Sequence, residues 1–313
     1  MPQNIHAVIG ATGATGRVII RELNSRGTTV RAISRRAHRD FPAGVTSIAA
    51  DALDAASLSE AVRGASVVYH CAMPTFENWR SDFPRMTRAI VHAAGATGAR
   101  VVFADDTWMY GRVDGPMSER TAENPVSHKG VLRAWLGEML LTAHHRGDAR
   151  VVIGRAPELF GPHVGSLLNA GFLGAAARGK RPVYIGDPDL PLTPMFIDDF
   201  GRGLITLADA EDAAGRAWMI PTPPPTTARR LVQLAAPTPA RRPVRLSRIS
   251  SRTGKALGLV WPLAREGAEM IYQFEQPFVI DAADFTNRFG ASPTPYTESV
   301  RVTANWYRDG QPS

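Results

Sequence analysis

Residues 5–20 of this 313-residue chain read IHAVIGATGATGRVII, and this stretch decides the fold. A β-branched, apolar run leads into three glycines spaced G-x-x-G-x-x-G, and an apolar pattern of helical period follows, which predicts a strand, a tight turn and a helix N-terminus. Glycines remove Cβ atoms where the backbone must turn and where a pyrophosphate must approach the helix N–H groups and the positive end of the helix dipole. We therefore expect a dinucleotide site formed by Gly10, Thr12, Gly13, Ala14, Thr15 and Gly16. A glycine-rich turn without a ligand is the alternative.

The end of the second predicted strand, residues 28–33, bears on which dinucleotide binds. An acidic residue about twenty positions beyond the glycines hydrogen-bonds the ribose hydroxyls of NAD(H) and repels a 2′-phosphate. This chain has Ser34, Arg35 and Arg36 there, and a guanidinium forks onto phosphate oxygens. The residues favour NADP(H) over NAD(H). The alternative is that both arginines only begin a solvated loop.

Further strands are predicted at residues 45–50, 65–72, 101–104 and 151–155, with helical patterns between them. Such alternation predicts an α/β fold, a doubly wound parallel sheet with right-handed crossovers, whose ligands bind beyond the carboxyl ends of the strands. Asp51 and Ala52 follow one strand and Ala72 ends another, so we place them on the cofactor side, with Asp51 against adenine. Asp54 is expected to cap the helix that follows it.

The second half of the chain has a looser pattern. A long helix is predicted over residues 129–145, and Asp198-Asp199 are expected to cap a helix over 200–208. We divide the chain into a dinucleotide-binding domain, residues 1–158, and a smaller substrate-binding lobe, residues 159–313, with segments near 195–220 returning to the sheet.

Composition narrows the class of protein. Hydrophobic residues make up 44% of the chain and charged residues 21%, as in globular domains. The chain enters a predicted strand almost at once, so we expect no N-terminal signal segment, and no run approaches the about 18–20 apolar residues of a membrane span. A single cysteine, Cys71, excludes an internal disulfide and suits a reducing cytoplasm. The net charge of +7 is dispersed, without an aromatic-interleaved basic stripe, so we expect no nucleic-acid partner. The eight histidines show no metal-ligand spacing.

Several motifs together resemble the extended short-chain dehydrogenase/reductase superfamily, in its NAD(P)-dependent epimerase/dehydratase branch. The resemblance covers nearly the whole chain. It rests on the three glycines, Asp51–Asp54, Met109-Tyr110-Gly111, Arg155-Ala156-Pro157 with Phe160-Gly161-Pro162, and Phe196–Asp199. It implies a Rossmann sheet. The helices near residues 78–96 and 129–145 match those that form a four-helix dimer bundle in that superfamily, and their apolar content permits a homodimer without requiring one.

The resemblance also implies where the chemistry lies, although the residue types differ. The family uses a Ser/Thr after the fifth strand and a Tyr-x-x-x-Lys pair on the next helix, where the tyrosine moves a proton as hydride moves. Here the Ser/Thr position falls on Asp106, with Thr107 adjacent, the tyrosine on Lys129 and the lysine on Arg133. We expect Lys129 to transfer the proton and contact the cofactor. Asp106 and Thr107 would orient the substrate oxygen, and Arg133 would hold the ribose.

Two of these residues have competing interpretations. Lys129 could instead be a solvent-facing residue of a first helical turn, although it is one of only three lysines in the chain. Tyr110 could supply a replacement phenol, but a tyrosine at the end of a buried strand is more often packed in the core.

The predicted function is an NADP(H)-dependent reductase or dehydrogenase acting on a carbonyl or alcohol of a small organic molecule. Two alternatives stay open because the catalytic pair is altered. One is a redox-neutral enzyme on the same fold, such as a dehydratase, cyclase or lyase. The other is a non-catalytic binding module that senses NADP.

Overall fold

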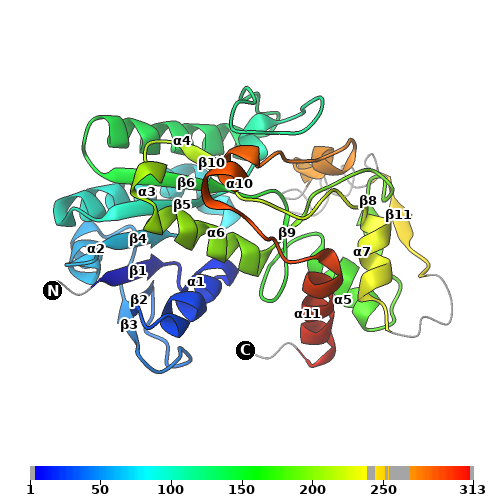
Figure 1. Cartoon of the computed structure of the whole chain (residues 1–313), viewed down its shortest axis with the longest axis horizontal. Coiled ribbons are helices and arrows are strands. Elements are labelled where there is room, and N and C mark those ends of the chain that lie inside the picture. Colours follow the sequence, from blue (N-terminus) through cyan, green and yellow to red (C-terminus); the bar gives the residue numbers. More distant parts are fainter. Residues whose placement is uncertain (1–3, 238–243, 251–252, 254–267, 311–313) are drawn as a thin grey trace. The chain divides into compact units, whose positions relative to one another are not determined.

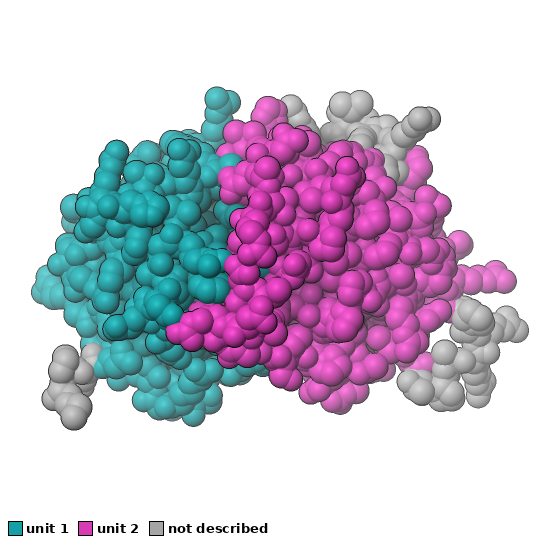
Figure 2. Space-filling view, turned by 45° about the horizontal axis from the view of Figure 1, so that its top comes forward, with its two compact units in different colours: residues 1–106, 132–156, 200–220 teal, residues 107–131, 157–199, 221–313 magenta. Residues whose placement is uncertain are grey.

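The computed structural model describes residues 4–237, 244–250, 253 and 268–310. The chain divides into two compact units, coloured separately in Figure 2. Unit 1 comprises residues 1–106, 132–156 and 200–220, and unit 2 comprises residues 107–131, 157–199 and 221–313. What each unit binds stays a prediction.

Unit 1 is built on a seven-stranded sheet of order β10-β6-β5-β4-β1-β2-β3, and every pair of neighbours is parallel (Figure 1). This sheet with its flanking helices confirms the predicted doubly wound Rossmann fold class. The strands are β1 (Ile5–Ile9), β2 (Thr29–Ser34), β3 (Val45–Ala49), β4 (Val67–His70), β5 (Arg100–Asp105), β6 (Arg150–Arg155) and β10 (Ala217–Met219). The central strand β4 is buried along its whole length, because helices cover both faces of a parallel sheet.

The connecting helices carry the apolar stripes that the sequence predicts. They are α1 (Ala14–Ser25), α2 (Ala55–Val62), α3 (Trp79–Thr97), α4 (His128–His145) and α6 (Ile197–Asp209). A Cβ built on Gly201 of α6 would lie 2.3 Å from Val18 of α1, so the missing side chain lets these two helices pack closely. The first residues of α4 and of α6 belong to unit 2.

Unit 2 consists of short elements. Strands pair in twos, β7 (Leu159–Phe160) with β9 (Met195–Phe196) and β8 (Val183–Ile185) with β11 (Ser247–Ile249). Helix α11 (Tyr296–Arg308) packs on α7 (Ala228–Ala235) and on α5 (Gly174–Ala177). The described residues of unit 2 also form η2 (Trp108–Tyr110), the π-helix η3 (Asn169–Leu173), η5 (Ile271–Phe274) and α10 (Ala283–Phe289). In unit 1, η1 (Phe76–Asn78) and η4 (Glu211–Ala213) are short 3-10 helices.

The two predicted helix caps have different outcomes. Asp54 caps α2 as expected, since its carboxylate accepts hydrogen bonds from the N–H groups of Ala56 and Ser57. The expectation for Asp198-Asp199 is wrong, because α6 begins at Ile197 and both acids lie inside its first turn. Asp199 instead accepts hydrogen bonds from the backbone N–H and the hydroxyl of Thr294. Acidic residues in a first turn still stabilise the helix through its dipole.

Candidate functional site

The structure explains the three glycines of the β1–α1 turn differently. Gly10 has a φ of +87°, and a Cβ on it would lie 2.6 Å from the backbone of Cys71 and Ala72. A Cβ on Gly16 would lie 2.4 Å from the carbonyl oxygen of Gly10. The backbone therefore requires both glycines. Gly13 has φ −72° and ψ 162°, which any residue adopts, and its Cβ would meet nothing closer than 3.4 Å.

The start of α1 has the features of an anion site. Gly13 is its N-cap and is exposed, no side chain caps the helix, and its first turn contains no acidic residue. Ala14 and Thr15 begin the helix, and the Thr12 carbonyl accepts a hydrogen bond from Arg17 Nε at 3.1 Å. The fold itself would tolerate a side chain at Gly13, so the backbone does not explain this glycine. A glycine here keeps the N–H groups at the start of α1 open to approach, which fits a pyrophosphate.

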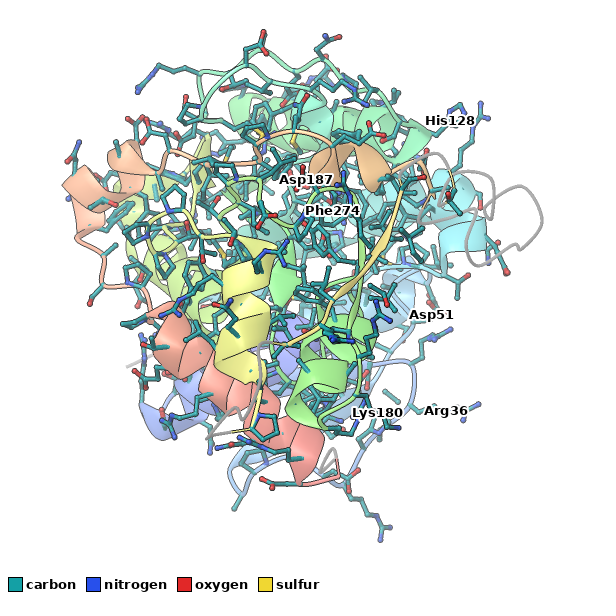
Figure 3. All side chains as sticks on the ribbon, turned by 90° about the vertical axis from the view of Figure 1, so that its right-hand side faces the viewer. Arg36, Asp51, His128, Lys180, Asp187 and Phe274 are labelled. Atoms are coloured by element: carbon teal, nitrogen blue, oxygen red, sulfur yellow. The ribbon has the colours of Figure 1, made fainter. Side chains whose placement is uncertain are left out.

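The residues after β2, β3 and β4 lie at the carboxyl edge of the sheet. The Ser34 hydroxyl donates to the carbonyl of Arg36 at 2.7 Å, Arg35 and Arg36 are exposed, and Figure 3 shows Arg36 extending away from the ribbon. Asp51 is exposed and its Oδ1 accepts the N–H of Leu53 at 2.9 Å. Ala52 is buried beside it, and Ala72, after β4, is half-buried. Their predicted contacts with NADP stay predictions.

A buried ion network joins β5, β6 and α4. Asp105 and Arg155 are Cα partners at the ends of adjacent strands, and Arg155 Nε donates to Asp105 Oδ2 at 3.2 Å. Arg133 Nη1 donates to the other oxygen, Oδ1, at 3.3 Å. Arg133 Nε also forms an ion pair with Asp106, whose Oδ2 lies 2.8 Å away. Two carboxylates thus offset two guanidinium charges in a place where an isolated charge would be strongly unfavourable.

Aromatic rings surround the Arg133 guanidinium. Its Cζ atom lies 5.0 Å from the ring centroid of Trp79, 4.9 Å from that of Phe83 and 5.8 Å from that of Phe103. Cation–π attraction adds to the ion pairs when the cation is desolvated. These contacts hold Arg133 firmly in unit 1. That Arg133 holds the nicotinamide ribose stays a prediction.

His70, at the end of β4, lies beside this network. Its ring centroid lies 4.9 Å from that of Phe103, its cross-strand partner, with the two rings tilted by 50°, and its Nε2 lies 3.0 Å from the Thr87 hydroxyl. Burial, helped by the positive charge of Arg133, lowers the pKa of His70 to about 3. The imidazole is therefore neutral in the native protein at ordinary pH.

The lowered pKa predicts an acid-labile fold. The unfolded chain binds a proton at His70 near pH 6.5 and the native chain only near pH 3, so stability is present above about 6.5 and is lost as the pH falls through this window. The loss is about 1.4 kcal/mol per pH unit. We expect His70→Gln to reduce the slope of unfolding free energy against pH between 7 and 5, measured by urea titration. His38→Gln, in an exposed loop, is the control, and an unchanged slope in His70→Gln contradicts the prediction.

Lys129 lies in the first turn of α4, on the part of the helix that belongs to unit 2. Its side chain is only 8% exposed, which excludes the solvent-facing interpretation. Its Nζ donates to Glu269 Oε1 at 2.5 Å, while the other oxygen of Glu269 accepts the backbone N–H of His128 at 2.9 Å. The carboxylate thus binds both the ammonium and the N-terminus of α4. This is a charge-assisted arrangement of the strong kind.

The segment after β5 packs directly against the start of α4. A Cβ on Gly130 would lie 2.5 Å from the carbonyl oxygen of Trp108, so the helix approaches this segment closely. Thr107 is 1% exposed, and its hydroxyl has no hydrogen-bond partner among the residues that the structure describes. The Tyr110 side chain is also buried, at 1% exposure, as in the core interpretation. A buried hydroxyl beside Trp108 fits the predicted role of Thr107 in orienting a substrate oxygen.

Sequence reasoning missed three charged residues of these clusters. Asp105 and Arg155 end otherwise apolar strands, and a charge at the end of a buried strand was a usable signal. Glu269 had no such signal, because it lies 140 residues from Lys129 and in no motif.

Comparison with protein families shows one match over most of the chain. The model of the NAD dependent epimerase/dehydratase family matches residues 6–220. Two curated relatives, the uncharacterized proteins Rv2047c of Mycobacterium tuberculosis and Mb2073c of Mycobacterium bovis, are 37% identical over 98 residues. That match covers 31% of this chain and only 11% of the length of each relative.

Solved structures share the fold at low identity. The dTDP-glucose 4,6-dehydratase DesIV of Streptomyces venezuelae, with NAD and DAU bound, has a TM-score of 0.76 and 17% identity over 98% of this chain and 97% of its own. The enzyme MoeE5, in complex with UDP-glucuronic acid and NAD, has a TM-score of 0.77 and 23% identity over 98% and 99%. UDP-glucuronic acid 4-epimerase of Bacillus cereus, with NAD, has a TM-score of 0.78 and 16% identity over 98% and 100%.

The described residues contain neither a metal-binding cluster nor a membrane-spanning helix. No group of three or more histidine, cysteine or carboxylate side chains among them is arranged to hold a metal ion. None of their helices has the length and hydropathy needed to cross a bilayer.

Proposed function

The chain belongs to the NAD dependent epimerase/dehydratase family, and from that premise we propose that it is an NADP(H)-dependent reductase or dehydrogenase of a small organic carbonyl or alcohol. The observation that carries the proposal is the buried ammonium of Lys129, held at the start of α4 by Glu269. A nicotinamide cofactor supplies hydride when bound. Lys129 supplies the proton to the carbonyl oxygen, which the Thr107 hydroxyl orients.

The cofactor proposal rests on the β1–α1 turn and the residues after β2. Gly13 leaves the start of α1 open to a pyrophosphate without being required by the backbone. Exposed Arg35 and Arg36 provide two guanidinium groups for a 2′-phosphate, where NAD-binding sites place an acid. NAD is the cofactor in the similar structures named above, so the choice between the two cofactors needs a direct test.

We expect the variant Arg35→Ala/Arg36→Ala to lose NADPH affinity about 10- to 100-fold, because charge-assisted hydrogen bonds to a phosphate contribute about 1.5–3 kcal/mol. NADH affinity should change little, since NADH has no 2′-phosphate. Fluorescence titration with both cofactors measures the ratio. Arg39→Ala, farther along the same exposed loop, is the matched control. Equal losses for NADPH and NADH would contradict the assignment.

The proton-transfer role of Lys129 predicts a large kinetic effect. Lys129→Met keeps the length and apolar stem of the side chain but removes the ammonium, so turnover should fall about 10²- to 10⁴-fold. The measurement is the loss of NADPH absorbance with a panel of aldehydes, ketones and keto acids. Lys180→Met, at an exposed lysine, is the control. Full turnover by Lys129→Met would refute the role.

One observation favours a redox-neutral enzyme as the second candidate. Arg133 stands where the family has a lysine, and its guanidinium is bound to Asp105, Asp106 and a set of aromatic rings. A dehydratase, cyclase or lyase needs no net hydride transfer. Cofactor deuterated at the hydride position separates the two candidates: deuterium appears in the product of a reductase and is absent from the product of a net redox-neutral reaction.

A further inference from the structure

We propose that Glu269 is a positioning residue of this site, which holds the Lys129 ammonium and passes protons between it and solvent. The proposal rests on the proposed role of Lys129 as proton donor. It assigns a function to a residue that no motif marks, in a segment far from α4 in the sequence.

The first argument is the geometry of the carboxylate. Glu269 Oε1 lies 2.5 Å from Lys129 Nζ, and Oε2 accepts the His128 N–H at 2.9 Å, so both oxygens have defined partners. Two simultaneous contacts leave the carboxylate one orientation, which in turn fixes the direction of the ammonium. A residue that only neutralised charge would not need the second contact with the helix N-terminus.

The second argument is that the chain segments carrying Lys129 and Glu269 both pack against the backbone carbonyl of Trp108. The Trp108 carbonyl is approached by Gly130, the residue after Lys129, where a Cβ would lie at 2.5 Å. The Tyr272 hydroxyl, three residues after Glu269, donates to the same carbonyl at 3.5 Å. Buried Met270 and Ile271 anchor the segment between Glu269 and Tyr272. The pair is therefore held from both sides rather than by a flexible surface contact.

The third argument is access to water. The Lys129 side chain is 8% exposed and that of Glu269 is 24% exposed. When Lys129 gives a proton to the oxygen of a carbonyl that accepts hydride, an alcohol forms and a neutral amine remains. One proton from water must then return to the amine, and the more exposed carboxylate, already in contact with it, provides the path. Each cycle takes one proton from solvent and places it on the product, so the proton count balances.

Lysine acetylation tests the positioning without any substrate. The chain has three lysines, Lys129, Lys180 and Lys255, and the last lies outside the described residues. The full chain is treated with acetic anhydride and each site is followed by mass spectrometry, with exposed Lys180 as internal reference. Glu269→Gln should raise the relative rate at Lys129 about tenfold or more, because it removes a charge-assisted hydrogen bond.

Two further variants keep this test decisive. Glu269→Asp retains a carboxylate and should return the Lys129 rate toward that of the wild type. Glu275→Gln removes a carboxylate of the same segment that pairs with Arg112, and it should leave the Lys129 rate unchanged. An unchanged rate in a folded Glu269→Gln protein, verified by circular dichroism, overturns the positioning role. This holds even if no carbonyl is reduced and the proposed function fails.

Turnover tests the relay itself. On a carbonyl that the wild type reduces, Glu269→Ala should lower kcat about 10-fold or more with little change in KM, and added formate or acetate should restore part of it, because a small acid replaces the missing proton carrier. The same acids should not restore Lys129→Met. Loss of kcat in Glu269→Ala without rescue by either acid overturns the relay and leaves the proposed reductase activity standing.

Discussion

Gly10→Ala should destabilise unit 1 by about 2–6 kcal/mol and Gly16→Ala by about 1–3 kcal/mol, whereas Gly13→Ala should fold normally and lose the cofactor. At Gly10 the backbone has a φ of +87°, which a side chain adopts with strain, and the added Cβ would press on the backbone of Cys71 and Ala72. At Gly16 the added Cβ would lie 2.4 Å from a backbone oxygen, which cannot turn aside as a side chain can. Such losses are a large part of the 5–15 kcal/mol typical of a folded domain.

Gly13→Ala separates the binding role from the fold. Alanine tolerates the backbone angles of Gly13, and the helix N-cap effect changes stability by only about 1 kcal/mol. The methyl group would occupy the open side of the helix N-terminus, so NADPH affinity should fall about tenfold or more. Urea unfolding and fluorescence titration measure the two effects on the same samples. A Gly13→Ala protein that binds NADPH like the wild type would argue that this turn serves the fold alone.

Asp105→Asn should destabilise the protein by about 3–5 kcal/mol, the usual effect of removing one member of a buried ion network. The Asp105 side chain is fully buried and accepts hydrogen bonds from both Arg133 and Arg155. Asparagine keeps the shape but removes the negative charge that both guanidinium groups share in a low-dielectric environment. The neutral amide also offers one hydrogen-bond acceptor where the carboxylate offered two.

An exposed ion pair provides the matched control for Asp105→Asn. Glu60 of α2 pairs with Arg63, the C-cap residue of that helix, and both side chains are mostly exposed, so Glu60→Gln should change the unfolding free energy by less than about 1 kcal/mol. Thermal and urea unfolding of both variants at one pH give the comparison. Similar small effects in the two variants would show that the network around Asp105 contributes little to stability.

The sequence was sufficient for the architecture of unit 1. Its helices and strands form from short sequence patterns, such as the apolar run of β4 or the Asp54 cap of α2. Such patterns depend on neighbours within a few residues. Right-handed crossovers restrict how the parallel strands can be connected. Where the expectation failed, at Asp198-Asp199, the competing partner was Thr294, almost a hundred residues away, and no local pattern reports such a contact.

Only part of the candidate site could be predicted from the sequence in the same way. Spacing alone placed the glycine turn at the start of α1, and Lys129 and Arg133 one turn apart on one helix. Spacing could not indicate which carboxylate each cation meets. The pairing of β5 with β6 brings Asp105 next to Arg155, and Arg133 binds the other oxygen of the same carboxylate. Lys129 binds Glu269 because Tyr272 of η5 holds this segment against the Trp108 carbonyl.

The sequence by itself thus determined the strand–turn–helix unit, the parallel sheet and the residue types available for chemistry, because periodicity, glycine geometry and helix capping are local. Only the tertiary structure decided that Gly10 and Gly16 serve the backbone while Gly13 leaves a space, and that Lys129 pairs with Glu269 whereas Arg133 pairs with Asp105. Both decisions depend on atoms from distant segments. Close packing and the high free energy of an unpaired buried charge select these partners, and both act only once the chain has folded.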